Sequence, residues 1–249
     1  LKSIGLIIVA AIFLFIMADY VNACSMIAFQ NLLDDSLQAI VNKPVEALVV
    51  VAILPAIIEE FLFRGMIYRG IANKSNKKIV IIISALLFAF LHMNFNQMCY
   101  AFVMGLVFAI VIYLTDNLSV SILLHMLFNA FTVIITCFEK SNAIQAILQC
   151  NIAGYTLFNP SLTDTQGKIE ISLLIIGGLI AILSAVIAGW LILLIAKTEK
   201  TTETTINNEN ILKDNDNIFK NNENWKPDFR FFAGSGVCIL IAILYEILL

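Results

Sequence analysis

Long apolar runs recur along this chain, and no other feature constrains its fold as strongly. About 20 consecutive apolar residues let an α-helix cross the hydrocarbon core of a bilayer, and a spanning segment must be helical to satisfy its own backbone hydrogen bonds. The sequence therefore predicts an all-α, polytopic transmembrane helical bundle of about seven to eight spans. The runs that we interpret as spans are Ile4–Met17, Val45–Ile71, Ile79–Met93, Met98–Leu114, Leu118–Phe138, Ile169–Ala196 and Phe231–Leu249. An eighth span would lie beyond an end of the chain or within Ile144–Phe158.

Composition supports a membrane protein and argues against a nucleic-acid-binding one. Hydrophobic residues make up 60% of the 249 residues and charged residues only 13%, about half the charged share of a soluble domain. The net charge is -3 and no basic run is interleaved with aromatic residues, so we expect the lipid bilayer and no nucleic acid as a partner. The five cysteines show no CxxC spacing and are typical of small apolar packing residues.

Changes in hydropathy divide the chain into five predicted parts. The segment 197–230 is dominated by Thr, Asn, Lys, Glu and Asp, and it has too little apolar content to fold alone. The five parts are a first span with an outer loop (1–43), a candidate catalytic core (44–138), an outer segment with a further span (139–196), a polar disordered linker (197–230) and a C-terminal span (231–249). The chain begins with Leu, and we expect its first apolar run to be a retained span rather than a cleaved signal peptide.

The distribution of Lys and Arg between the loops predicts the orientation in the membrane, because cytoplasmic loops carry the excess of these residues. With a cytoplasmic N-terminus, the inner side holds Lys2, Arg69, Lys74, Lys77, Lys78 and the whole linker, whereas the outer side holds Lys43, Lys140 and Lys168. The sequence therefore predicts a multi-pass integral membrane protein with its N-terminus in the cytoplasm. The short loops and the Asn- and Lys-rich linker favour a bacterial cell membrane.

Two adjacent carboxylates and a guanidinium lie inside the run Val45–Ile71. A charge at the bilayer centre costs roughly 2.5–3.5 kcal/mol on insertion scales, so such a cluster marks a candidate functional site. Glu60 and Arg64 are four residues apart and can pair on one helix face, whereas Glu59 lies about 100° around the helix. We therefore predict a supporting Glu60–Arg64 pair and assign Glu59 as the catalytic base. Pro55 removes one helical hydrogen bond and leaves a carbonyl for water or a neighbour to satisfy.

The two histidines of the chain also lie in apolar runs. His125 and Asn129 are four residues apart, so we expect both to face the same partner. In the predicted orientation, Glu59, His92 and His125 lie at the same depth to within roughly one helical turn. Without partners these groups would strongly destabilise a membrane helix. The sequence therefore predicts that Glu59 and both imidazoles converge in the membrane interior.

Taken together, three short motifs in the predicted spans resemble the motifs of a known family. The motifs are Glu59-Glu60-x-x-x-Arg64, Phe88-x-x-x-His92 and His125-x-x-x-Asn129. Each is weak alone, but in this order they resemble those of the CAAX protease and bacteriocin-processing (CPBP, or Abi) family of intramembrane endopeptidases. The resemblance covers roughly residues 44–136, and no motif position departs from the pattern. It implies an enzyme that hydrolyses a peptide bond of a membrane-associated protein or a peptide.

The resemblance also implies a role for each catalytic candidate. Glu59 resembles the glutamate that activates a water molecule, and His92 resembles the residue that helps to hold that water. His125 and Asn129 resemble the pair that stabilises the oxyanion formed when water attacks the peptide carbonyl. The predicted carboxylate–guanidinium pair resembles the supporting pair of the family.

A metal ion is the open alternative to this glutamate-type chemistry. Zinc would take Glu59, His92 and His125 as ligands, all from separate helices. The chain lacks the HExxH motif, in which two histidines on one helix would preorganise the ion. We therefore favour an enzyme without a cofactor and keep a zinc metalloprotease as the alternative.

Two functions from other classes are compatible with the same residues. A non-catalytic bacteriocin self-immunity or scaffold protein could keep the fold and bind a partner. An ion-coupled transporter also carries intramembrane carboxylates and histidines, but it would favour paired inverted repeats, and the sequence shows none. The substrate is not specified by any motif. In a bacterium a prenylated CAAX substrate is not expected, and peptide maturation or immunity is then the expectation that the resemblance implies.

Overall fold

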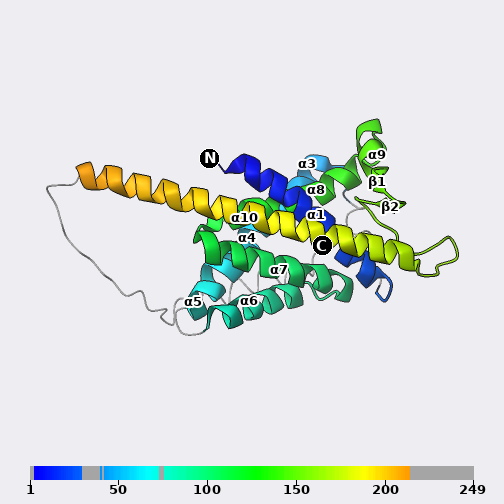
Figure 1. The fold of residues 1–249 in the computed structure, drawn as a ribbon, viewed down its shortest axis with the longest axis horizontal. Helices are drawn as coiled ribbons and strands as arrows, with labels where there is room; N and C mark the ends of the chain where they lie inside the picture. The colour runs from blue at the N-terminus through cyan, green and yellow to red at the C-terminus, as the bar shows by residue number, and fades with distance from the viewer. Residues whose placement is uncertain (1–2, 30–39, 41, 73–75, 214–249) are drawn as a thin grey trace.

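The computed structural model describes residues 3–29, 40, 42–72 and 76–213, and helices dominate it (Figure 1). The prediction of an all-helical membrane fold is confirmed, and the structure adds one short β-hairpin whose two strands have two residues each. The helices are α1 (Ile4–Met26), α3 (Pro44–Ala47), α4 (Leu54–Glu60), α5 (Arg69–Ala72), α6 (Lys77–Leu91), α7 (Phe95–Thr115), α8 (Leu118–Cys137), α9 (Asn142–Leu148) and α10 (Ile171–Lys213). Two π-helical segments, η1 (Leu48–Ile53) and η2 (Phe61–Tyr68), and the antiparallel strands β1 (Asn151–Ile152) and β2 (Tyr155–Thr156) complete the described elements.

Within the described residues, four helices are long and apolar enough to cross a membrane, so the predicted number of seven to eight spans is not confirmed. These four are α1, α7, α8 and the part of α10 at Ile171–Thr201. The predicted run Val45–Ile71 is helical throughout, but π segments divide it into five consecutive pieces. Helix α6 has only 15 residues, and the predicted C-terminal span at 231–249 lies outside the described residues.

Helix α10 continues beyond the predicted span and into the predicted linker. It has 43 residues and ends at Lys213, so residues 197–213 are helical where disorder was expected. This part of the chain contains neither Pro nor Gly, the residues that most readily end a helix. The end of α10 projects beyond the other helices (Figure 1). The remainder of the predicted linker, 214–230, lies outside the described residues.

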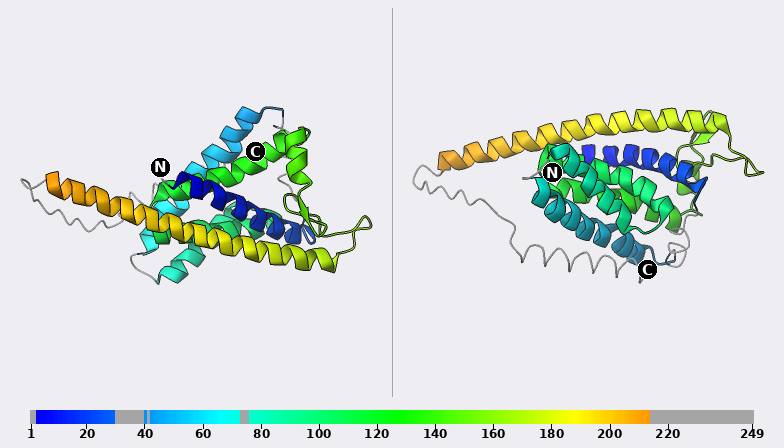
Figure 2. Two further views of the ribbon diagram at one scale, coloured as in Figure 1. Left: turned by 45° about the horizontal axis from the view of Figure 1, so that its top comes forward. Right: turned by 90° about the horizontal axis from the view of Figure 1, so that it is seen from below.

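The helices pack in layers, with α10 on one side, α1 beneath it, and the remaining helices below (Figure 2). Helix α1 contacts α7 and α8 as well as α10, and α6 packs along α7. The main apolar core draws buried residues from all of these elements. Its fully buried members include Leu14, Leu62, Phe108, Leu124 and Ile195. This core encloses the segment that carries the acidic doublet.

Polar contacts tie the helix ends at one end of the bundle. The Glu199 carboxylate accepts hydrogen bonds from Ser3 Oγ at 2.8 Å and from Asn117 Nδ2 at 2.9 Å. Arg69 Nη2 lies 3.1 Å from Asp116 Oδ1. These contacts join the start of α1, the α7–α8 junction, α5 and α10. These elements therefore meet at the end of the bundle that includes Arg69, which the charge pattern assigns to the cytoplasmic side. That this end is cytoplasmic stays a prediction.

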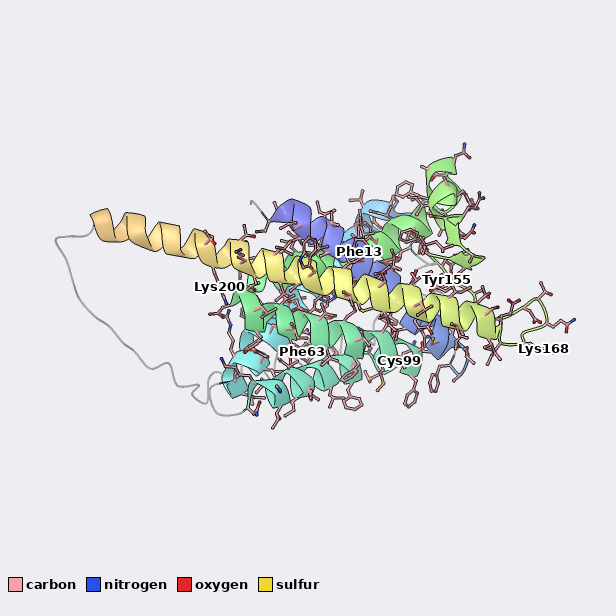
Figure 3. The ribbon with its side chains drawn as sticks, viewed as in Figure 1. Phe13, Phe63, Cys99, Tyr155, Lys168 and Lys200 are labelled. Carbon is pink, nitrogen blue, oxygen red and sulfur yellow. The ribbon has the colours of Figure 1, made fainter. Side chains whose placement is uncertain are left out.

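Polar contacts also join segments at the opposite end of the bundle. The Asn159 backbone N–H donates to Asp19 Oδ2 at 3.0 Å, and Asn96 Nδ2 donates to Ser25 Oγ at 2.6 Å. Figure 3 shows Lys168 and Lys200 well apart along the bundle, with Lys168 in the loop before α10. The sequence assigns these two lysines to opposite sides of the membrane, and the orientation stays a prediction.

Helices α6 and α7 approach closely where Gly105 meets Ala85. A Cβ atom added to Gly105 would lie 3.0 Å from the Ala85 Cα atom and 3.2 Å from its Cβ and carbonyl oxygen atoms. Small residues at such a crossing let two membrane helices pack backbone to backbone. Because the nearest atom belongs to the backbone, the helices would have to separate to accommodate a larger residue.

Gly105→Ala is therefore expected to destabilise the bundle by about 1–3 kcal/mol, the usual penalty of overpacking. Gly189→Ala is the matched control, because a Cβ at Gly189 in α10 meets nothing within 4 Å. Thermal unfolding of the detergent-solubilised protein measures both variants. Equal Tm values for the two variants would contradict the close approach of α6 and α7.

Candidate active site

The predicted pair of Glu60 and Arg64 forms the buried centre of the site. Arg64 Nη1 donates to Glu60 Oε1 at 2.9 Å, and both side chains are fully buried. The second terminal nitrogen, Nη2, donates to the Gly105 carbonyl at 2.9 Å. The guanidinium carbon also lies 4.4 Å from the centre of the Phe88 ring and 5.4 Å from that of Phe108. Charge pairing, hydrogen bonding and cation–π contacts together compensate for the removal of Arg64 from water.

Glu60 also joins this pair to α8. Its Oε2 atom accepts a hydrogen bond from Ser121 Oγ at 2.7 Å, and its Oε1 atom lies 3.1 Å from His125 Nδ1. The contact with His125 was not predicted from the sequence, and neither was any role for Ser121. Ser121 precedes His125 by four residues, so the spacing that singled out His125 and Asn129 also places Ser121 on the same face of α8.

His125 lies between the two glutamates. Its Nδ1 atom faces Glu60, and its Nε2 atom lies 3.9 Å from Glu59 Oε2. The contact with a carboxylate makes Nδ1 a donor, a tautomer assigned from the hydrogen-bond network. Phe108 stacks on the imidazole with ring centres 4.8 Å apart, and Phe88 meets it edge to face at 5.7 Å. These contacts hold the ring with Nε2 directed toward Glu59.

The cluster brings two carboxylates, a guanidinium and an imidazole together among buried groups. Because burial strongly disfavours unpaired charge, the position of each of these groups depends on that of the others.

In the described part of the chain, His92 contacts Phe88, which in turn contacts the cluster. His92 caps the C-terminal end of α6, where its Nδ1 atom lies 3.0 Å from the Phe88 carbonyl oxygen. Its ring meets Phe88 edge to face at 5.2 Å, and Phe88 in turn contacts His125. The structure thus places both imidazoles against one phenylalanine, and the predicted role of His92 in holding water stays a prediction.

Asn129 contacts the backbone before the acidic doublet. Its Nδ2 atom donates to the Val51 carbonyl at 3.1 Å. Val51 lies four residues before Pro55, so the neighbour that satisfies a carbonyl freed by the proline is Asn129. His125 and Asn129 therefore both face the 44–72 helix, as expected, but they contact different parts of it. Because α8 runs antiparallel to the 44–72 helix, Asn129 lies one turn further from Glu59 and reaches Val51 instead.

The proposed zinc ligands do not form a three-residue cluster in the described part of the chain. Among these residues, no group of three His, Cys, Asp or Glu side chains is placed to hold a metal ion. His125 and His92 each direct Nδ1 to an oxygen acceptor, a contact that metal-bound histidines also make, so the zinc alternative is left to experiment. We therefore derive no chemical step through a metal ion.

Together, the fold and the site define a helical integral membrane protein with a buried carboxylate–guanidinium–imidazole cluster. Residues 41–131 match the family described as Rce1-like, type II CAAX prenyl endopeptidase. The chain is also 34% identical over 116 residues to the "Membrane-embedded CAAX protease MroQ" of Staphylococcus aureus (strain USA300). That alignment covers 44% of this chain and 47% of the relative, so it spans about half the relative's length. No solved structure matches the chain.

The family match covers the region that holds the acidic doublet and its partners. In this region the chain is similar to CAAX proteases, which supports the family resemblance that the three motifs predicted. The comparisons do not test the role of any single site residue.

Arg64→Leu is expected to destabilise the protein by about 3–5 kcal/mol, because it leaves the buried Glu60 without its cation. Arg69→Leu is the matched control, since its pair with Asp116 is exposed, and exposed pairs contribute about 0–1 kcal/mol. Chemical denaturation in detergent micelles measures both. A similar loss in the two variants would show that the buried pair does not support the fold.

Proposed function

We propose that this protein is a glutamate-type intramembrane endopeptidase that hydrolyses a peptide bond of a membrane-associated protein or a peptide. The observation that carries the proposal is the approach of Glu59 Oε2 to His125 Nε2, at 3.9 Å, inside a buried cluster. Similarity to a relative that is itself called a membrane-embedded CAAX protease adds support. The protein is proposed to lie in a bacterial cell membrane with its N-terminus in the cytoplasm.

In the proposed reaction Glu59 is the general base. It removes a proton from a water molecule held with the help of His92, and the water oxygen attacks the carbonyl carbon of the scissile bond. The carbonyl becomes a tetrahedral oxyanion. Glu59 then returns the proton to the amide nitrogen, the C–N bond breaks, and a carboxylic acid and an amine form, which are released as a carboxylate and an ammonium group after the acid passes its proton to the amine. A burial that excludes bulk water strengthens a carboxylate as a base.

His125 is the proposed donor to the oxyanion, through a protonated Nε2 atom. The contacts of its Nδ1 atom with Glu60 and of its ring with Phe108 hold this donor in place before substrate arrives. An amide nitrogen carries two N–H groups, so Asn129 retains a second donor beyond the one that Val51 accepts. Such a preorganised donor contributes about 2.7–4 kcal/mol to transition-state stabilisation.

Glu60 and Arg64 are proposed to act through His125 rather than on the substrate. Glu60 holds the imidazole, and Arg64 and Ser121 hold Glu60. All three partners are fully buried, which leaves them out of reach of a peptide. Their loss would misplace the proposed oxyanion donor.

Glu59→Gln is expected to lower proteolysis by about 10²–10⁴-fold, because the amide cannot act as a general base. The protein should still insert and unfold at a similar temperature. The matched control is Glu46→Gln, which changes an exposed glutamate paired with Lys43. Mass spectrometry of membrane peptides from cells expressing each variant identifies the cleavage products.

The same comparison separates this function from a non-catalytic one. Peptides that disappear with Glu59→Gln and persist with Glu46→Gln are substrates or close products. An immunity or scaffold protein would leave the peptide pattern unchanged and would keep its protective effect with Glu59→Gln, which would reject the proposed enzyme.

Chelation tests the proposed absence of a metal. Prolonged treatment of the purified enzyme with EDTA and 1,10-phenanthroline should leave cleavage of such a peptide unchanged. The control is a zinc metalloprotease treated in the same detergent. Loss of cleavage that only added zinc restores would replace the glutamate-type mechanism by the metalloprotease alternative.

A further inference from the structure

The helical hydrogen-bond pattern changes register just before the acidic doublet. In η1 the bonds are π-helical, and the Leu54 N–H donates to the Val49 carbonyl five residues back. The next residue, Pro55, has no N–H to donate. The α-helical pattern of α4 then runs to Glu60. The change from π to α geometry thus falls at the proline, four residues before Glu59.

Asn129 of α8 contacts this change of register directly. In α geometry the Val51 carbonyl would accept the N–H of residue 55, which is a proline here. The Asn129 amide donates to that carbonyl at 3.1 Å instead. A backbone carbonyl within the membrane cannot accept a hydrogen bond from bulk water. A side-chain donor that satisfies it therefore constrains the backbone strongly.

We propose that Asn129 is a positioning residue: by bonding to the Val51 carbonyl, it fixes the register in which the helix presents Glu59 to His125. Val51, Pro55 and Glu59 follow one another at four-residue intervals and therefore share one helix face. His125 and Asn129 share a face of α8 at the same interval. The two helices are joined at two points on these faces, with Asn129 on Val51 and His125 beside Glu59.

The geometry of the helix makes this attachment consequential. Each residue added to or removed from a helical turn rotates everything that follows by about 100°. If the π-to-α change moved by one residue, Glu59 would turn away from His125. The contact with Asn129 stabilises one position of that change. The inference rests on the proposed function of Glu59. It assigns Asn129 a positioning role in addition to its proposed donation to the oxyanion.

A double-mutant cycle between Asn129 and Pro55 tests the inference. Asn129→Leu keeps a similar volume but removes the donor, and Pro55→Ala supplies a backbone N–H that can reach the Val51 carbonyl. The wild type, both single variants and the double variant are compared as full chains in detergent micelles. Asn142→Leu makes the same substitution at an exposed asparagine of α9 and serves as the control.

Two readouts are taken from each protein. The first is Tm, which does not depend on activity. The second is kcat and KM for a membrane peptide that the wild type cleaves and Glu59→Gln does not. Asn129→Leu should lower Tm by about 3 °C or more and lower kcat about ten- to hundredfold, with KM changed less than about threefold. The double variant should regain most of the lost Tm and only part of the lost kcat, because the second amide donor of Asn129 stays absent.

Other outcomes overturn the inference. Additive losses of Tm and kcat in the double variant would show that the bond to Val51 has no such role. Recovery of Tm with no recovery of kcat would show that Asn129 affects catalysis only as the proposed oxyanion donor and not by positioning Glu59. If the wild type cleaves no peptide, the proposed function fails, and coupling in Tm alone then supports or overturns the Asn129–Val51 attachment.

Discussion

The site depends on the buried ion pair between Glu60 and Arg64. A carboxylate and a guanidinium taken out of water are stable only when their remaining hydrogen-bonding groups find partners. Glu60 meets this requirement with Ser121 and His125 of α8. Arg64 meets it in part, through the Gly105 carbonyl of α7, since its Nε atom has no hydrogen-bond partner among the described residues. The pair therefore does more than neutralise two charges. It joins three helices at the level where the imidazole is held.

One face of α8 organises the contacts around this pair. Ser121, His125 and Asn129 recur every four residues and meet the 44–72 helix in reverse order. The first two contact the acidic doublet, and the third contacts the backbone before Pro55. Because the two helices pack antiparallel, one polar stripe on α8 contacts both the acidic side chains and a backbone carbonyl of the neighbouring helix.

The features that the sequence predicts best are those that depend only on residue spacing along a single helix. The Glu60–Arg64 pair and the shared face of His125 and Asn129 follow from four-residue intervals, and the structure has the pair. The Gly105 carbonyl could not be predicted, because a backbone acceptor on another helix leaves no signal in the pattern of side chains. Ser121 could have been found by extending the His125 stripe one turn toward the N-terminus. The partner of Asn129 was missed because it depends on how far two antiparallel helices are offset.

Hydropathy alone also misjudged the end of α10. Low apolar content correctly excludes an independent domain at 197–213, but a polar segment can extend a helix that has already begun. Nucleation is the unfavourable step, and the apolar part of α10 has already completed it. Absence of Pro and Gly then lets the helix continue to Lys213.

The family match ends at residue 131, but the apolar core also includes residues outside the matched region. Leu14 of α1 and Ile195 of α10, both outside the matched region, are as deeply buried as Leu124 within it. The carboxylate of Glu199 fastens α10 to the start of α1 and to the α7–α8 junction. The matched segment therefore shares its apolar core with the flanking helices α1 and α10. Substitutions in these two helices would change the packing around the Glu59–His125 contact without any change in the motifs.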